Sequence, residues 1–298
     1  MVQGIFIEGL VYGIMVLGVF ITFRILNFPD LTVDGSFPLR AAIMAGLLVA
    51  GVSPAFALMA SFAGGAAAGL VTALIHNKLK VHGLLAGIIT MTMLYSVNIR
   101  VMGNKSNLPL LRTETLFTKI SALSQGLNIS QDAGLLIFVL IFVLLLKSLI
   151  DLFFHTDLGL CMGALGSNEQ MIVSQGVNPD TIKIIGISLS NGLVGLSGAF
   201  ACQYLGFSNV DLGQGIVVSG LASVMIGEFL IRSNKISILT LRVILGSIVF
   251  KGLMYAARFY GYRIKMTPND LKLITGLLII IALIITQVKI PGKKRKSS

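Results

Sequence analysis

DLGLCMGALGSNEQMIVSQGVNPD, residues 157–180, is a polar, glycine-rich segment in the middle of a chain that is otherwise strongly apolar. Hydrophobic residues make up 55% of the 298 residues and charged residues only 12%, whereas soluble domains carry about 25% charged residues. The apolar runs are continuous and do not alternate, which predicts an all-α bundle of membrane-spanning helices and not a barrel. The segment therefore lies in water between two spans, where an ordered polar helix is typical of a docking site.

The residues of this segment predict a short capped helix. Ser167 or Asn168 is a favourable N-cap, and Gly176 is a favourable end. Met171 and Ile172 present apolar side chains between these two signals. Two interpretations stay open at this point: the helix lies in a groove on a partner protein, or it is an amphipathic connector that rests on lipid headgroups.

Outside this segment, apolar stretches long enough to cross a membrane follow one another along the chain. A spanning helix needs about 20 residues, and fewer when it is broken or buried in the bundle. The nine candidates are about 4–23, 39–52, 54–75, 83–101, 133–151, 182–205, 213–231, 236–257 and 270–287. The 39–52 stretch is short and is predicted to be half a span, because Ser53-Pro54 ends it. Residues 1–288 are predicted to be one transmembrane domain, followed by a basic tail over 289–298.

The basic tail orients the chain. Five Lys and Arg side chains crowd residues 289–298, which places the tail in the cytoplasm beside anionic lipid. Counting back along the spans puts the 157–180 segment inside and the N-terminus outside. The polar loop over 103–131 is then external. No aromatic residue is interleaved with the tail, which argues against a nucleic-acid partner.

Two polar interruptions resemble each other and suggest an internal repeat. LNFPDLTVDG, residues 26–35, follows the first span, and GFSNVDLGQG, residues 206–215, follows the sixth. We predict two inverted repeats over about 4–101 and 182–287. The span over 133–151 and a cytoplasmic segment over about 155–182 join them. Inverted repeats with broken helices are typical of transporters, with the pathway at the repeat interface.

Acidic residues in these interruptions have two readings. Thr32 or Asp34 caps a short helix that begins near Ser36, or Asp30 and Asp34 form a polar hinge that lines the cytoplasmic mouth of a pathway. Asp211 holds the corresponding position of the second interruption, on the outside, where it faces a delivery partner or caps a helix.

Polar groups inside spans are costly and face the bundle interior. Those inside the predicted spans are Asn191, Gln203, Glu228, Arg242 and Lys251. Glu228 and Arg242 are predicted to form an ion pair between neighbouring helices. The chain does not offer the series of ionisable groups that a proton or cation relay needs.

Enzyme functions find no support in the sequence. His76, His82 and His155 lack metal-ligand spacing, and the phosphate-binding motif Gly-x-x-x-x-Gly-Lys-Ser/Thr is missing. We therefore predict no catalytic residues, no metal site and no cofactor on this chain. If transport is driven by ATP, the ATP and its Mg²⁺ bind to another chain.

Two motifs resemble those of a known transporter family. The pattern Ala164-x-Gly166-x-Asn168, with Gly176-Val177 beyond it, resembles the coupling loop of permease subunits in the branched-chain amino acid and ribose group of ABC importers. LNFPDLTVDGSFPL, residues 26–39, resembles the polar break after an early span in the same group. The resemblance covers nearly the whole chain and is greatest to a bacterial subfamily of permeases associated with tryptophan, tyrosine or related solutes.

This resemblance implies a type II-like importer permease in the bacterial plasma membrane. It implies a homodimer of permease chains, two cytoplasmic ATPase subunits and an extracytoplasmic substrate-binding protein. By motif match, the ATPase contacts would be Gly166, Asn168, Glu169, Met171 and Gly176. The polar break would be Asn27, Asp30, Thr32, Asp34 and Gly35. Arg40, Ile172 and Ser174 depart from the family pattern, which leaves the fine packing of both motifs open.

We therefore expect a permease that moves a small polar solute, an amino acid of aromatic or branched-chain type, with ATP hydrolysis on a partner. The alternative is an ion-coupled secondary transporter that works alone, in which Asp30, Asp34 or Glu228 is essential. A third reading is a membrane scaffold without a pathway.

Overall fold

A computed structural model describes residues 2–111, 113–126, 128, 130–233, 235–263, 273–280 and 284. In this part of the chain, eight helices are long and apolar enough to cross a membrane. The helical elements are α1 (Val2–Phe20), continued by the π-helical η1 (Ile21–Ile25), α2 (Thr32–Val49), α3 (Pro54–Leu79), α4 (Gly83–Val101), α5 (Leu116–Gly126), α6 (Gln131–Phe154), α7 (Asp157–Ser167), α8 (Glu169–Ser174), α9 (Pro179–Leu205), η2 (Val210–Gly213), α10 (Ile216–Leu230) and α11 (Ile236–Arg263). The predicted helical membrane bundle is confirmed.

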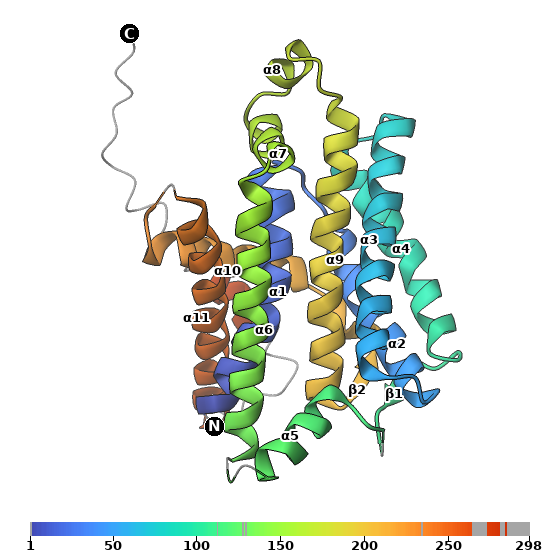
Figure 1. Ribbon diagram of the computed structural model, residues 1–298, viewed down its shortest axis with the longest axis vertical. Coiled ribbons are helices and arrows are strands. Elements are labelled where there is room, and N and C mark those ends of the chain that lie inside the picture. The colour runs from blue at the N-terminus through green and yellow to red at the C-terminus, as the bar shows by residue number, and fades with distance from the viewer. Residues whose placement is uncertain are drawn as a thin grey trace.

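The helices stand side by side with two different ends (Figure 1). One end carries α7 and α8, and the opposite end carries α5 and the N-terminus. At that opposite end β1 (Asn107–Pro109) pairs antiparallel with β2 (Phe207–Asn209), so that Asn107 faces Asn209. The external loop predicted over 103–131 is thus partly ordered, as a strand and a helix.

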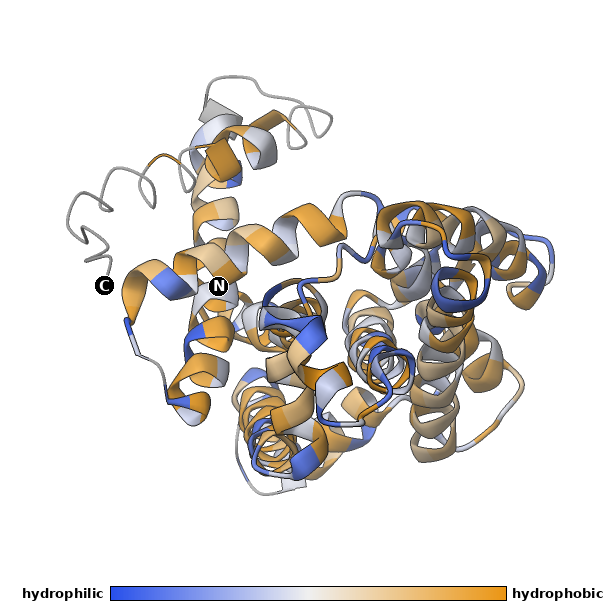
Figure 2. Ribbon diagram, turned by 90° about the horizontal axis from the view of Figure 1, so that it is seen from above, coloured by the Kyte–Doolittle hydropathy of each residue, from blue (hydrophilic) through white to orange (hydrophobic). Residues whose placement is uncertain are grey.

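The core lies where α1, α2 and α9 meet. These three helices are the most buried of the spans, whereas α4 and α6 are the least buried. Seen along the bundle, apolar residues dominate the helices and hydrophilic residues gather in the loops (Figure 2). Such an outward apolar surface is what a lipid environment requires of a helical bundle.

The structure corrects one span and leaves another partly outside its description. The predicted half-span over 39–52 is wrong, because α2 begins seven residues earlier, at Thr32, and runs for 18 residues. Pro38 lies inside this helix, where neighbouring groups in a membrane bundle tolerate the backbone hydrogen bond that proline removes. Of the ninth candidate, 270–287, residues 273–280 are helical and most others lie outside the described residues, as does the basic tail over 289–298. The division into repeats stays a prediction.

Candidate functional site

The segment around residue 168 forms two short helices at one end of the bundle. Asn168 caps α8 by accepting a hydrogen bond from the backbone N–H of Met171 at 3.2 Å. Gly176 has a φ of +78°, a conformation that favours glycine, and it follows the end of α8 as predicted. Of the two predicted caps, Asn168 is the one used, because Ser167 is the last residue of α7.

The outer face of α8 is mixed in character. Met171 and Val173 are 49% and 54% exposed, whereas Ile172 is 1% exposed and belongs to the core. The expectation that Ile172 presents itself to a partner is therefore wrong, because its side chain points into the bundle. Glu169, predicted as an ATPase contact, forms an ion pair of 2.8 Å with Lys183 of α9.

The end of α7 touches the backbone that follows α1. A Cβ on Gly166 would overlap the carbonyl oxygen of Ile25, the last residue of η1, so only glycine permits this approach. A pocket of about 330 Å³ beside this contact is lined by Gly166, Asn168 and Glu169 together with Asn27. The structure thus brings four of the predicted coupling and break residues to one surface.

Beyond Asn27 the chain turns inward to a buried polar network. Asp30 is fully buried, and its carboxylate accepts hydrogen bonds from the N–H of Thr32 at 2.9 Å and from Nδ2 of Asn191 at 2.7 Å. The hydroxyl of Ser36 donates to Oδ1 of Asn191 at 2.8 Å, and the hydroxyls of Thr32 and Thr72 are 2.7 Å apart. The network joins α2, α3 and α9 through side chains that lie far apart in sequence.

Arg40 extends this network. Its side chain is fully buried, and its guanidinium donates to the carbonyl oxygens of Ser36 and Gly64. Among the described residues it has no carboxylate partner within ion-pair distance, and a buried cation of this kind needs every carbonyl it can reach. From the sequence, Arg40 was noted only as a departure from the family pattern. The signal for a buried polar centre was Arg40 itself, because it is a single arginine at the start of an apolar run.

Asp34 does not cap its own helix. From the first turn of α2, its carboxylate accepts the N–H groups of Val217 at 2.9 Å and Gly215 at 3.2 Å, which begin α10. That Asp30 and Asp34 line the cytoplasmic mouth of a pathway stays a prediction. Asp30 bonds Asn191, which lies 12 residues into α9, about 18 Å from its start at 1.5 Å per residue.

The two polar interruptions meet around one pocket of about 360 Å³. Asp34 and Gly35 line it from α2, and Asp211 and Gln214 line it from the segment before α10. Asp211 is exposed and accepts a hydrogen bond from Nε2 of Gln214 at 2.8 Å. The cap of η2 is Asn209, so the capping reading of Asp211 is wrong. A Cβ on Gly35 would approach the backbone of α4 to 2.9 Å, which accounts for glycine there.

Two further predicted intramembrane groups, Gln203 and Glu228, lie near the ends of their helices. Oε1 of Gln203 accepts the N–H of Leu116 at 2.8 Å and thereby fixes the start of α5. Oε1 of Glu228 lies 2.8 Å from Arg242, so the predicted ion pair is confirmed, and also 2.8 Å from Arg24, which the sequence did not suggest. This three-residue group ties η1, α10 and α11 together, and η1 also touches the end of α7 through Ile25 and Gly166.

Two further polar contacts were not expected from the sequence. Asp151 of α6 accepts a hydrogen bond from the hydroxyl of Thr240 of α11 at 2.6 Å. Lys251 of α11 pairs with Glu8 of α1 at 3.5 Å. Glu8 and Lys251 are 243 residues apart, so spacing along the chain gave no signal for their contact.

The chain is similar to known membrane proteins along nearly its whole length. The pattern of the family described as branched-chain amino acid transport system / permease component matches residues 1–283. The tyrosine transport system permease protein of Clostridioides difficile strain R20291 is 41% identical over 287 residues, which cover 96% of this chain and 92% of that protein. The ribose import permease protein of Escherichia coli strain K12 is 30% identical over 206 residues, which cover 69% of this chain and 62% of that protein.

The fold agrees with these matches. The solved structure of an ABC transporter in an inward-facing conformation superposes with a TM-score of 0.53 at 16% identity, over 96% of this chain and 85% of that one. At 16% identity, this similarity shows that the two proteins share a fold and nothing more. Together with the family match over residues 1–283, the eight candidate spans show that the chain is a membrane permease component of an ABC transporter and belongs to the family of branched-chain amino acid transport system permeases.

Proposed function

We propose that this chain is the membrane subunit of an ATP-driven importer of an aromatic amino acid, with ATP hydrolysed on a separate cytoplasmic chain that docks on α7 and α8. The substrate class is supported by the 41% identity to a tyrosine transport system permease over nearly the full length of both proteins. The docking surface is supported by the exposed Met171 and Val173, which offer apolar contacts at a capped helix.

The contact between Gly166 and Ile25 carries the proposal. No side chain separates the end of α7 from the backbone of η1, so a force on α7 reaches Ile25 directly. From Ile25 the chain runs within five residues to Asp30 and its network in α2, α3 and α9. Movement of a docked ATPase would thus be passed to the helices at the centre of the bundle, which is what alternating access requires.

The remaining partners follow from this assignment. A second copy of the chain completes the pathway, and an extracytoplasmic binding protein delivers the amino acid to the end that carries α5 and the two strands. The complex lies in the bacterial plasma membrane. ATP and Mg²⁺ bind to the ATPase subunits and not to this chain.

A matched pair of glycine variants tests the coupling contact. The tagged chain is purified in mild detergent from its native membranes, so that its partners come with it, and the complex is reconstituted in vesicles supplied with ATP on the cytoplasmic face. We expect Gly166→Ala to abolish ATP-dependent uptake of labelled tyrosine because the new Cβ forces α7 away from Ile25. Gly163→Ala, on the same helix with no atom near its Cβ position, should transport as the unaltered chain does.

The alternative function gives the opposite result in a simpler experiment. Vesicles that contain only the purified chain are given a sodium or proton gradient and labelled tyrosine. Uptake under these conditions would establish a secondary transporter and overturn the proposal. Equal uptake by the Gly166→Ala and Gly163→Ala complexes would show that α7 is not the coupling element.

A further inference from the structure

A third cavity, of about 470 Å³, opens among α1, α9, α10 and α11. It lies toward the end that carries the N-terminus, opposite α7 and α8, since its walls include the first turns of α1, the last turn of α9 and the start of α6. Its size falls within the roughly 300–1,000 Å³ of small-molecule sites. None of the predicted site residues lines it, and it is separate from the surface proposed for the ATPase.

Two helices each turn one face toward this cavity. Gly4, Glu8 and Tyr12 on α1 are spaced four residues apart, which places them on the same side of a helix. On α11 the lining residues Lys251, Met254, Tyr255 and Arg258 follow the i, i+3, i+4, i+7 pattern. The charged and aromatic side chains are therefore collected by helix periodicity and not scattered over loops.

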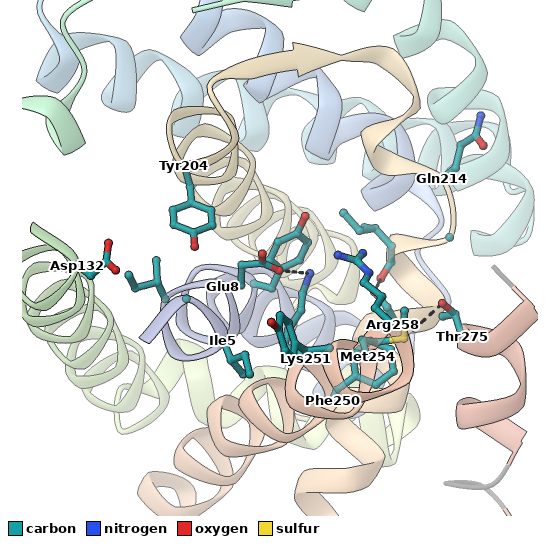
Figure 3. A pocket seen from close by; sticks show the side chains of 17 residues that line it. Ile5, Glu8, Asp132, Tyr204, Gln214, Phe250, Lys251, Met254, Arg258 and Thr275 are labelled. Atoms are coloured by element: carbon teal, nitrogen blue, oxygen red, sulfur yellow. Dashed lines mark hydrogen bonds and ion pairs between the residues drawn. The ribbon is translucent and has the colours of Figure 1, made fainter. Parts of the chain in front are cut away.

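The charges on the wall balance. Two carboxylates, Glu8 and Asp132, face two cations, Lys251 and Arg258. In Figure 3 the labelled Asp132 lies beyond Glu8 on the side of α6, whereas Arg258 lies on the far side of Lys251. Such an order offers an acidic end and a basic end to one ligand. A simple cation or anion would leave one pair of like charges uncompensated.

The ion pairs already present leave the four charged side chains of the wall able to bind a ligand. Nζ of Lys251 lies 3.5 Å from Oε2 of Glu8, longer than the about 2.7–2.9 Å of a strong charge-assisted hydrogen bond. The same ammonium lies 3.2 Å from the centre of the Tyr12 ring. Within the described residues, neither Arg258 nor Asp132 forms an ion pair. A ligand with its own carboxylate and ammonium would give each of these groups a partner.

Aromatic rings form the rest of the wall. Tyr204, Phe250 and Tyr255 line the cavity beside Tyr12, whose own ring already stacks on Phe37 and lies under the ammonium of Lys251. Tyr204 reaches over Gly4, whose missing side chain leaves room for the phenol. Rings of this kind stack on another aromatic ring in offset or edge-to-face geometry. Charge balance and aromatic lining together describe a zwitterion with an aromatic side chain.

We propose that this cavity is an outer binding site for a zwitterionic aromatic α-amino acid. Its carboxylate is bound by Arg258 and Lys251, its ammonium by Glu8 and Asp132, and its ring by the aromatic wall. The proposal rests on the proposed function and adds to it the residues that contact the substrate. The exposed turn at Gln214 and Gly215 lines both this cavity and the pocket of Asp34 and Asp211.

Measuring tyrosine binding to the chain alone, without a delivery protein, tests this site separately from the rest of the transport system. The chain is reconstituted in vesicles, and tritiated L-tyrosine at millimolar concentration is displaced by unlabelled L-tyrosine, by tyramine, which lacks the carboxylate, or by 3-(4-hydroxyphenyl)propionate, which lacks the ammonium. We expect both analogues to displace the label more weakly than tyrosine does. Replacing Arg258 should weaken tyrosine binding about tenfold or more, because a hydrogen bond to a charged group is lost.

Comparing the two analogues distinguishes a variant that loses a contact with the ligand from a variant that is only misfolded. In Arg258→Gln, the preference for tyrosine over tyramine should fall, while the preference over the propionate should stay. Glu8→Gln should give the reverse pattern. Arg100→Gln, an exposed arginine at the end of α4 that does not line the cavity, is the matched control and should change neither ratio. A variant that merely loosened the fold would lower binding of all three compounds alike.

The outcomes distinguish the two proposals. If the complex imports tyrosine but both ratios are the same in Arg258→Gln as in Arg100→Gln, the outer site is wrong and the proposed function stands. If the reconstituted chain binds no tyrosine although the complex imports it, the outer site is likewise overturned. If the native complex imports no aromatic amino acid at all, both proposals fail together.

Discussion

The two polar interruptions, residues 26–35 and 206–215, look alike in sequence and differ in the folded chain. In the first, Asp30 is fully buried and is held by groups from α2 and α9. In the second, Asp211 is exposed and its side chain accepts only from Gln214, three residues away, among the hydrogen bonds described. At Asp30 the first interruption is therefore a joint between helices, whereas at Asp211 the second is a local turn at the surface.

The two regions are nevertheless connected. Asp34 of the first supplies the acceptor for the N–H groups of Gly215 and Val217 at the end of the second. The start of α10 thus depends on a side chain from α2, 181 residues earlier. This asymmetry predicts that replacing Asp30 or Asp34 costs stability and that replacing Asp211 does not.

Replacing Asp30 should have the largest effect. In Asp30→Ala the N–H of Thr32 loses its acceptor and Asn191 loses one of its two, which should lower the free energy of unfolding by about 2–4 kcal/mol. The measurement is unfolding of the purified chain by SDS in mixed micelles. Asp211→Ala, in the corresponding position, is the control. A cost no larger than that of the control would remove the distinction between joint and turn.

A swapped pair sharpens this prediction. In Asp30→Asn the new amide directs a donor at the Nδ2 donor of Asn191, so the single variant should also be destabilised. Combining it with Asn191→Asp restores a donor opposite an acceptor, and the hydroxyl of Ser36 keeps its acceptor. The double-mutant cycle should therefore show a favourable coupling energy of about 1 kcal/mol or more. Additive losses would mean that Asp30 and Asn191 do not act through their mutual contact.

Replacing Asp34 should rank second. Asp34→Ala leaves the first N–H groups of α10 without a cap, which costs about 0.5–2 kcal/mol in helices generally. Asp34→Asn keeps an acceptor oxygen and should lose less. Hydrogen exchange at Gly215 and Val217 should be faster in the alanine variant. Unchanged exchange at these two amides would show that the cap does not hold the start of α10.

Local signals in the sequence account for what could be predicted. Apolar runs gave most of the spans, and Asn168 and Gly176 marked the start and end of α8 because caps act over three or four residues. The pair of Glu228 and Arg242 was predictable because both are costly inside a membrane.

Long-range contacts account for what could not be predicted. The partners of Asp34 are 181 and 183 residues away, and short-range capping rules assigned it to its own helix instead. The start of α2 was misplaced because the polar stretch over 26–35 was treated as an interruption, although the helix begins within it, at Thr32. The outer cavity draws its charges from α1, α6 and α11, whose side chains meet only after the chain has folded.

Replacing Thr32 should lower the free energy of unfolding by less than replacing Asp30 or Asp34, and a second substitution at Thr72 should add little to the loss. Thr32→Val removes one partner of the buried hydroxyl pair with Thr72, and hydrogen bonds between membrane helices are worth about 0.6 kcal/mol on average. Thr32→Val with Thr72→Val removes both hydroxyls and leaves neither without its partner, so the double variant should unfold with less than the summed loss. SDS unfolding of the three variants checks this. A fully additive loss would mean that the two hydroxyls do not bond each other.

Replacing Asp211 should have the smallest effect on stability and is informative for that reason. Asp211→Asn keeps an oxygen for the amide of Gln214 and changes only an exposed charge, so the free energy of unfolding should move by less than about 0.5 kcal/mol. The same charge lies at the end of the bundle where we propose that a binding protein delivers the amino acid. Its loss should therefore weaken stimulation of ATP hydrolysis by that protein while basal hydrolysis stays constant.

If instead Asp211→Asn destabilises the chain as much as Asp34→Ala does, the second interruption is a joint like the first. The contrast between Asp30 and Asp211 would then have to be abandoned, because both interruptions would stabilise the fold through their aspartates although one is buried and the other is exposed.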